Sequence, residues 1–336
     1  MMILGIETSC DDTGAAILRE QSILSNIVST QIVHKNFGGI VPELASRAHI
    51  QAIVPVVQEA LNQSNCSLND VDGIAVTYGP GLAGSLLVGL SVSKGLAQSL
   101  NIPFIGVNHL EGHIWANKLV RSELEPPFIV LIVSGGHTQL VYVKGWGHYQ
   151  MLGRTRDDAA GEAFDKVGKL LNLGFPGGPV IEKTARDGRG DAISFPRAFL
   201  EKGSLDFSFS GLKTAVLNHV RALNPAELET RIPDIARCFQ DAVVDVLVQK
   251  TISAAEKMKV KQICLAGGVA VNGVLQKHMK AACDKAGYQV FWPTPDLCAD
   301  NGAMIARTGL FYLSQQIHSL NNLNPVPTLN FTHDAI

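Results

Sequence analysis

Short apolar runs recur along the chain and repeatedly end in turns rich in glycine and small polar residues. Apolar runs of this length, bounded by turn residues, are typical of buried strands. Met2–Ile6 and Ala15–Leu18 flank a turn that carries hydroxyls and carboxylates, which predicts a β-hairpin. By the same reasoning, further strands are predicted at residues 74–77, 128–133, 139–143 and 263–266.

Longer stretches have the spacing of helices instead. From Ala236 to Met258, apolar side chains recur at helical intervals, and Pro42–Leu61 is amphipathic in the same way. Asp157, Asp158 and Glu162 have the acidic character of a helix start. Further helices are predicted up to about residue 100, from about residue 271, and over residues 301–313. Strands that alternate with helices predict an α/β architecture with mixed sheets.

The length of 336 residues is more than one domain usually holds, at about 150 residues per domain. The order of elements that opens the chain begins again at Phe128, which suggests two related lobes without a short sequence repeat. Glu123–Pro127 has the composition of a linker. We therefore expect lobes at residues 1–125 and 126–336, with the helix at 301–313 returning to the first lobe.

Composition narrows the class of protein. Hydrophobic residues make up 46% of the chain, which supports a large core, and the apolar runs are far too short to cross a bilayer. The start of the chain lacks the basic and long apolar regions of a secretory signal. The six cysteines form no C-x-x-C pair, which favours a reducing compartment. Together these features predict a cytoplasmic protein without a membrane partner.

The net charge of −2 gives no global sign of nucleic-acid binding, since proteins that bind nucleic acids usually carry a basic balance. A local patch is the alternative. Basic residues cluster loosely from Arg154 to Lys169 and from Arg186 to Arg197, although such clusters are usually solvated surface.

His109 and His113 follow directly after an apolar run. On a helix, residues four apart share a face, so both rings can reach a single ion. Glu111 stands between them, so the metalloprotease motif H-E-x-x-H is absent. Asp300, at the start of the last predicted helix, is a candidate third ligand in a set that suits iron or zinc. The alternatives are an incidental histidine pair and a helix-capping aspartate.

Two glycine turns are candidate phosphate sites. Ser134–Thr138 joins two predicted strands, and its glycine pair can aim backbone N–H groups at an anion, although such a pair is commonly only a tight turn. Gly267–Asn272 follows a buried strand and opens a helix, where a nucleotide can lie. Neither the Rossmann nor the Walker fingerprint is present. Asn272 could contact a base or ribose edge, and Glu162 and Asp165 could contact ribose hydroxyls.

These motifs together resemble the TsaD family, bacterial tRNA threonylcarbamoyladenosine transferases once described as O-sialoglycoprotein endopeptidases. The resemblance covers nearly the whole chain, up to about Leu313. The motifs that carry it are, in chain order, GIETSCD (5–11), VPELASR (41–47), NHLEGH (108–113), VSGGHT (133–138), DDAAGEAFDK (157–166), FSFSGLK (207–213), GGVAVN (267–272) and DNG (300–302).

The resemblance implies an actin- and Hsp70-like fold of two lobes with a nucleotide-like ligand in the cleft. It also implies transfer of the threonylcarbamoyl group from threonylcarbamoyl-AMP to N6 of adenosine 37, in tRNAs that read codons beginning with A. One Fe(II) or Zn(II) ion would be held by His109, His113 and Asp300, with Asp11 close by. Our hypothesis for Asp11 is a general base. The implied substrate contacts are Ile132, Val133, Ser134, Gly135, Gly136, Asp165, Gly178 and Asn272.

The resemblance further implies partner proteins, TsaB and TsaE, with TsaC or a relative supplying the adenylate. Such a complex could provide a tRNA-binding surface, of which the net charge of this chain alone gives no sign. The alternative functions are an ATP-dependent kinase or ATPase of the same fold, a metalloprotease, and a non-catalytic scaffold.

Overall fold

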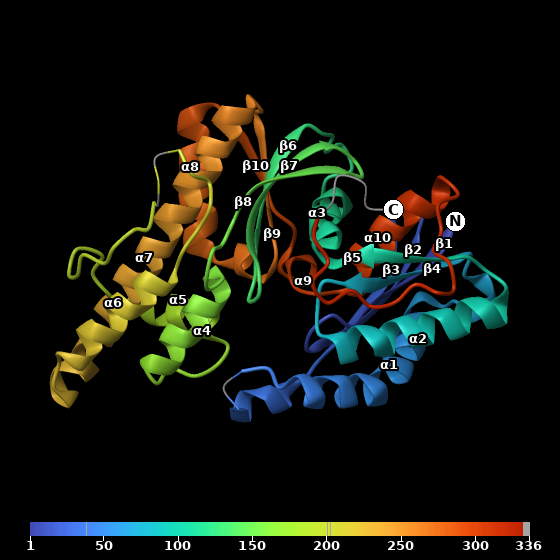
Figure 1. The fold of residues 1–336 in the computed structure, drawn as a ribbon, viewed down its shortest axis with the longest axis horizontal. Helices are drawn as coiled ribbons and strands as arrows, with labels where there is room; N and C mark the ends of the chain where they lie inside the picture. The colour runs from blue at the N-terminus through green and yellow to red at the C-terminus, as the bar shows by residue number, and fades with distance from the viewer. Residues whose placement is uncertain (38, 200, 202, 332–336) are drawn as a thin grey trace. The chain divides into compact units, whose positions relative to one another are not determined.

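The computed structural model describes residues 1–37, 39–199, 201 and 203–331. These residues form two compact units (Figure 1). The first unit comprises Met1–Leu124 and Pro293–Phe331, and the second comprises Glu125–Trp292. The chain therefore leaves the first unit once and returns to it for its last helix.

The first unit is built on a five-stranded sheet in the order β3-β2-β1-β4-β5. β1, β2 and β3 are antiparallel neighbours, whereas β4 and β5 run parallel to β1. The strands are β1 (Met2–Glu7), β2 (Asp12–Arg19), β3 (Ser22–Thr30), β4 (Gly73–Gly79) and β5 (Phe104–Asn108). The mixed sheet confirms the predicted α/β class.

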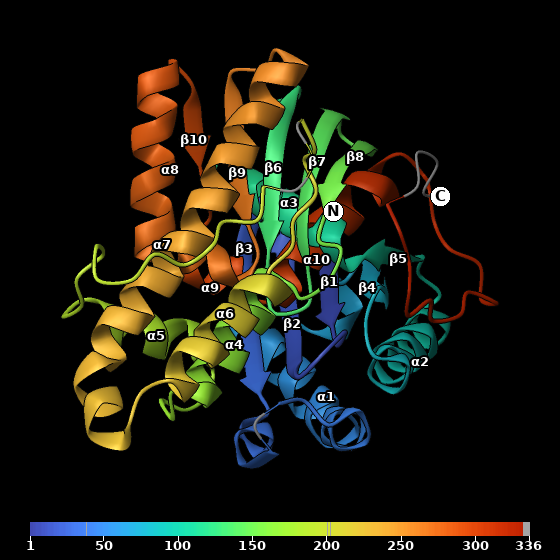
Figure 2. The ribbon, with the colours of Figure 1, turned by 60° about the vertical axis from the view of Figure 1, so that its left-hand side comes forward.

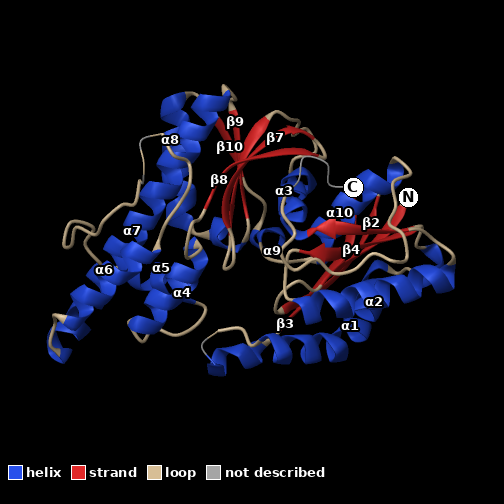
Figure 3. Cartoon of the chain, viewed as in Figure 1, coloured by secondary structure: helices blue, strands red, loops and turns tan. Residues whose placement is uncertain are grey.

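Alternate residues of β1 enter two different cores, because side chains on a strand point to opposite faces. Leu4 packs with residues of α1 and α2, and Ile3 packs with residues of α3 and α10. Both faces of the sheet are thus covered by helices (Figure 3). The helical segments of this unit are η1 (Ile32–Phe37), α1 (Pro42–Ser64), η2 (Leu68–Asp70), α2 (Ala83–Leu100), α3 (His109–Val120), α9 (Pro295–Cys298) and α10 (Gly302–Ser314).

Gly5 of β1 and α10 approach so closely that a side chain does not fit between them. A Cβ on Gly5 would lie 2.2 Å from the carbonyl oxygen of Gly302 and 2.5 Å from the nitrogen of Ala306. We predict that Gly5→Ala lowers the free energy of unfolding by about 3 kcal/mol, the upper range for overpacking, because only backbone can yield here. Urea unfolding measures this change.

Gly95→Ala is the matched control for Gly5→Ala. Gly95 is an exposed residue of α2, and a Cβ there meets no atom within 4 Å. Alanine should therefore stabilise that helix, by about 0.5–1 kcal/mol. Equal effects of the two substitutions would contradict the close contact between β1 and α10.

The second unit repeats the strand arrangement of the first (Figure 2). Its sheet has the order β10-β9-β6-β7-β8, with β6, β7 and β8 antiparallel and β9 and β10 parallel to β6. Its strands are β6 (Phe128–Val133), β7 (Thr138–Gly145), β8 (His148–Arg154), β9 (Gln262–Ala266) and β10 (Gln289–Phe291). Its helical segments are α4 (Ala160–Leu170), α5 (Gly177–Ala185), α6 (Ser210–Arg221), α7 (Pro225–Met258), η3 (Gly268–Val271) and α8 (Gly273–Ala286).

Every strand and helix predicted from the apolar pattern is present. The pattern gave no prediction for β3, β8 and β10, and α7 begins eleven residues before the predicted start at Ala236. Among the described residues, no helix has the length and apolar character needed to cross a lipid bilayer. All six cysteines are free thiols.

Candidate functional site

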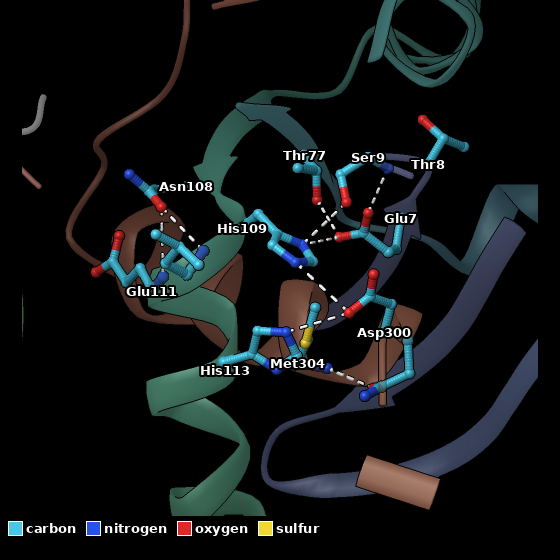
Figure 4. A network of polar contacts seen from close by, with 12 residues as sticks. Glu7, Thr8, Ser9, Thr77, Asn108, His109, Glu111, His113, Asp300 and Met304 are labelled. Atoms are coloured by element: carbon cyan, nitrogen blue, oxygen red, sulfur yellow. Dashed lines mark hydrogen bonds and ion pairs between the residues drawn. The ribbon is translucent and has the colours of Figure 1, made fainter. Parts of the chain in front are cut away.

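The two histidines lie on the first turns of α3, immediately after β5. Asn108 caps this helix, because its side-chain oxygen accepts hydrogen bonds from the backbone N–H groups of Leu110 (2.9 Å) and Glu111 (3.4 Å). The helix therefore begins at His109 and presents His113 one turn further along the same face. The two ring centroids are 4.8 Å apart (Figure 4).

Asp300 joins the histidines from the short connection between α9 and α10. Its Oδ1 lies 3.2 Å from Nε2 of His113 and 3.5 Å from Nε2 of His109. The capping alternative for Asp300 is wrong, because Asn301 caps α10 by accepting a hydrogen bond from the N–H of Met304 (3.0 Å). The carboxylate of Asp300 faces the two imidazoles instead (Figure 4).

The geometry of these three side chains fits one metal ion. Their ligand atoms all lie within 4.8 Å of one another. Two ligands that each bind an ion at about 2.0–2.2 Å lie roughly 3–4 Å apart, which matches both distances to Asp300. His113 is fully buried, yet neither ring nitrogen has a hydrogen-bond partner among the described residues. A buried imidazole that makes no hydrogen bond is costly in a protein core and ordinary in a metal site.

Glu7, at the end of β1, adds a buried carboxylate behind His109. Burial alone would lower the pKa of His109, but the negative charges of Asp300 and Glu7 raise that pKa to about 9. Burial alone would likewise raise the pKa of Glu7, but the attraction of His109 outweighs it and the pKa is lowered. Without an ion, the cluster therefore holds a proton on His109, and protons compete with a metal ion for the site.

Asp11 lies in the connection between β1 and β2 of the same unit. Burial, together with the negative charge of Asp300, raises the pKa of its carboxyl group. Asp12, which sequence reasoning did not single out, follows the same trend, and burial raises its pKa to about 7. A carboxylate with a raised pKa is a stronger proton acceptor than an exposed one.

The predicted substrate contacts all belong to the second unit. Ile132 and Val133 are fully buried in β6, so only their backbone can meet a ligand. Ser134 closes the following turn, since its N–H donates to the carbonyl of His137 (2.8 Å) and its hydroxyl accepts from the N–H of His137 (3.1 Å). Gly135 and Gly136 are exposed at the tip of this turn, and no atom stands within 4 Å of where a Cβ would be.

Several of these segments converge on the Ser134 turn. The N–H of Gly161, in the first turn of α4, donates to the carbonyl of Ser134 (3.2 Å). Gly267 adopts a positive φ of 87° and passes against the backbone of Val133, where a side chain would collide. Asp165 of α4 accepts a hydrogen bond from the N–H of Gly177 (2.6 Å), which fixes the start of α5. The neighbouring Gly178 has open space around its Cα.

Asn272 is engaged by the protein itself. Its side-chain oxygen caps α8 by accepting from the N–H of Leu275 (2.9 Å), and its amide donates to Gln240 (2.9 Å) and Glu182 (3.2 Å). Glu182 also accepts from the N–H of Gly273 (3.1 Å). A direct contact between Asn272 and a ligand would replace one of these bonds. Sequence reasoning missed Glu182 and Gln240, because no local motif marks them.

Asp157 lies just before α4 and binds the start of α6 through hydrogen bonds. Its carboxylate accepts hydrogen bonds from the N–H groups of Phe209 (2.8 Å) and Ser210 (3.2 Å), and from the hydroxyls of Ser208 and Ser210. Burial alone would raise the pKa of Asp157, but the hydrogen bonds from Ser208, Phe209 and Ser210 lower it. These bonds therefore contribute stability that depends on the ionised carboxylate.

We predict that Asp157→Asn lowers the free energy of unfolding by about 1 kcal/mol at pH 7, because the amide keeps one acceptor oxygen but loses the charge that strengthens these hydrogen bonds. Because the folded-state pKa is depressed, this contribution is complete above the ordinary aspartate pKa of 3.8 and is lost as the pH falls below it. Urea unfolding at pH 7 and pH 3.5 tests this. A difference between wild type and variant that stays constant would contradict it.

Comparison with known proteins places the chain in a family. A family model described as "TsaD: tRNA N6-adenosine threonylcarbamoyltransferase" matches residues 22–307. The protein of that name from Clostridioides difficile (strain 630) is 52% identical over 332 residues, covering 98% of both chains. The protein of that name from Desulfitobacterium hafniense (strain Y51) is 52% identical over 330 residues, covering 98% of this chain and 97% of the relative.

Solved structures with low sequence identity share the fold alone. HypF of T. kodakarensis matches with a TM-score of 0.63 at 15% identity, over 94% of this chain and 48% of HypF. Component A of the Acidaminococcus fermentans (R)-2-hydroxyglutaryl-CoA dehydratase matches with a TM-score of 0.55 at 13% identity, over 94% of this chain and 98% of that one. These likenesses support the actin-like fold class. By its sequence relatives, this chain belongs to the TsaD family of tRNA N6-adenosine threonylcarbamoyltransferases.

Proposed function

We propose that this chain transfers the threonylcarbamoyl group of threonylcarbamoyl-AMP to N6 of adenosine 37, in tRNAs that read codons beginning with A. The observation that carries the proposal is the family relation at 52% identity over 98% of the chain. The clustering of His109, His113 and Asp300 supports it, because these residues suit a reaction that needs a polarised acyl group.

The reaction pairs a good leaving group with a poor nucleophile. Threonylcarbamoyl-AMP is a mixed anhydride, so AMP leaves readily, whereas the N6 amine of adenine carries little nucleophilic electron density. One divalent ion, Fe(II) or Zn(II), held by His109, His113 and Asp300 would supply Lewis-acid polarisation of the acyl donor. Binding of the phosphate and removal of the proton from the attacking amine must come from groups of the chain itself.

The exposed backbone of Gly135 and Gly136 can bind the phosphate of the adenylate, because successive N–H groups in a turn attract an anion. Gly178 and Glu182, on the first two turns of α5, can flank the ribose. Asp11 is the proposed general base that takes the proton from the attacking amine, and its raised pKa makes it a better acceptor.

Two other functions are less well supported. A metalloprotease needs a base beside its zinc-binding histidines, and Glu111 instead accepts hydrogen bonds from Tyr312 (2.7 Å) and Trp115 (3.4 Å) in the interior. An ATP-dependent kinase or ATPase shares the fold, but the clustered histidines and aspartate have no evident role in such an enzyme. Rapid hydrolysis of ATP by the isolated chain would favour this second function.

The expected partners follow from the family. TsaB and TsaE would join this chain in a complex, TsaC or a relative would supply the adenylate, and the location would be the cytoplasm with the tRNA. Several large apolar side chains on α1 and α2, those of Ile50, Val54 and Leu87, are more than half exposed and offer a surface for a protein partner.

The proposal is tested by reconstitution. The chain, purified with the partners it associates with, is mixed with threonylcarbamoyl-AMP and a tRNA transcript, and the modified nucleoside is measured by mass spectrometry. We expect threonylcarbamoyladenosine in a transcript with adenosine at position 37, and none in a matched transcript with guanosine there. Absence of product from both transcripts, with intact adenylate and folded protein, would contradict the proposed transfer.

A further inference from the structure

Glu7 is a carboxylate with no access to solvent, at the end of the central strand β1. A buried charge is strongly destabilising unless partners compensate it. Among the described residues, no lysine or arginine forms an ion pair with Glu7, and its ion-pair partner is His109. The burial of the Glu7 carboxylate must therefore be explained by its contact with His109.

Three polar groups converge on the two oxygens of Glu7. Oε1 accepts a hydrogen bond from the N–H of Ser9 (2.5 Å), and Oε2 accepts one from the hydroxyl of Thr77 (2.6 Å). Oε2 also lies 3.0 Å from Nδ1 of His109 (Figure 4). The contacts with Ser9 and Thr77 hold the carboxylate in one orientation, so its remaining acceptor capacity is aimed at the imidazole.

We propose that Glu7 is a positioning residue, which keeps the proton of His109 on Nδ1 so that the lone pair of Nε2 faces the metal. The inference rests on the proposed metal site. The geometry supports it, since the ring turns Nδ1 toward Glu7 and Nε2 toward Asp300, at 3.0 and 3.5 Å respectively. A carboxylate that accepts from a metal-binding histidine fixes both the tautomer and the ring orientation.

Ser9 cannot take this role alone. Its hydroxyl lies 3.2 Å from Nδ1 of His109, but a hydroxyl can either donate or accept and so accommodates both tautomers. An ionised carboxylate can only accept. Glu7 is therefore the contact that forces Nδ1 of His109 to be the donor.

Glu7→Gln should move the proton of His109 from Nδ1 to Nε2, while the size of the side chain at position 7 stays the same. The backbone N–H of Ser9 can only donate, so the oxygen of the new amide must face Ser9. The NH₂ group of the amide then faces His109 and Thr77. The hydroxyl of Thr77 can turn to accept, and Nδ1 of His109 must accept as well. This places the proton of His109 on Nε2, the atom that should bind the ion.

Zinc affinity of the purified chain, measured by competition with a chromophoric chelator, tests the inference. We expect Glu7→Gln to bind Zn²⁺ roughly 10–100-fold more weakly than wild type, the usual loss when the carboxylate behind a metal-binding histidine is removed. Thr13→Val is the matched control, because it removes a buried contact between a hydroxyl and an imidazole (Thr13 and His49, 2.8 Å) in the same unit. Its zinc affinity should equal that of wild type.

His113→Ala separates this inference from the metal site on which it rests. If His113→Ala loses zinc and Glu7→Gln binds it as wild type does, the role of Glu7 is wrong and the metal site stands. If His113→Ala and wild type bind zinc equally, the metal site itself is wrong. Loss of zinc in Thr13→Val to the same degree as in Glu7→Gln would assign the effect to general packing and overturn the inference.

A second measurement uses the wild-type protein and does not depend on a variant that folds. In the zinc-loaded chain labelled with ¹⁵N-histidine, NMR reports which ring nitrogen of His109 carries the proton. We expect the proton on Nδ1. A proton on Nε2 would overturn the inference, since that nitrogen could then not bind the ion.

Discussion

His113→Ala should abolish threonylcarbamoyl transfer and weaken the binding of Zn²⁺ by more than about 100-fold, because losing a ligand should exceed the 10–100-fold cost of losing a group behind one. His113 is fully buried and makes no hydrogen bond through either ring nitrogen among the described residues. Its removal costs the core the ion pair with Asp300 (3.2 Å) and the packing of the ring, but no hydrogen bond. The loss of zinc binding and of transfer should follow from the loss of the metal ligand.

Two readouts separate that loss from unfolding. Zinc affinity and the rate of tRNA modification should both be lost in His113→Ala, while the metal-free variant still unfolds in one cooperative thermal transition, at a temperature lowered by the cavity that the ring leaves. His219→Ala is the control, since this half-buried histidine of the second unit packs against Phe195 with ring centroids 5.8 Å apart. It should keep both zinc binding and transfer. A His113→Ala protein that is folded and modifies tRNA at the wild-type rate would contradict the metal-assisted reaction.

Asp11→Asn should lower the rate of transfer by roughly 10²–10⁴-fold, the typical contribution of a general base. Binding of the adenylate should change little, because asparagine keeps the shape of the side chain and the proposed adenylate contacts lie in other segments. The rate is measured in single turnovers, and binding is measured with a non-hydrolysable analogue of threonylcarbamoyl-AMP. Asp296→Asn, which alters an exposed residue of α9, is the control and should behave as wild type.

The dependence of the rate on pH gives an independent test of Asp11. Burial and the charge of Asp300 raise the pKa of this carboxyl group above its ordinary value. A base must be deprotonated, so the wild-type rate should fall as the pH is lowered through that raised pKa, and the residual rate of Asp11→Asn should not fall with it. Loss of adenylate binding in Asp11→Asn would instead make Asp11 a residue that holds the ligand.

The fold was predictable wherever the local pattern is strong. The hairpin of β1 and β2 and the helices α1, α2 and α10 followed from apolar spacing and turn residues. The edge strands β3, β8 and β10 did not, because they are half exposed and their side chains alternate weakly. A short strand with one solvent-exposed face has too few apolar residues for its pattern to be recognised in the sequence.

The candidate metal site was predictable only in part. The spacing of His109 and His113 is local, so one helix start is enough to bring them together. The sequence left two roles open for Asp300, metal ligand or helix cap. The choice depends on whether Asn301 caps the helix instead. Glu7 and Thr77 could not be predicted, because they meet His109 only through the sheet order that sets β1 beside β4 and β4 beside β5.

The proposed adenylate contacts in the second unit were likewise predictable only where they form a local motif. The glycine turn at residues 134–138 is a local motif, and its exposed glycines are where the sequence predicts them. The environment of Asn272 is not local, because Gln240 and Glu182 reach it from α7 and α5. Sequence alone therefore could not show that its amide is already hydrogen-bonded.

The most direct test of the account is the amount of threonylcarbamoyladenosine in tRNA, measured by nucleoside mass spectrometry. The cells carry, as their only copy, either the wild-type chain or the double variant His109→Ala, His113→Ala at matched abundance. We predict normal levels of the nucleoside with the wild-type chain and none with the double variant. Unchanged levels in the double variant would contradict the metal-assisted transfer, and unchanged levels after deletion of the whole chain would contradict the transferase function itself.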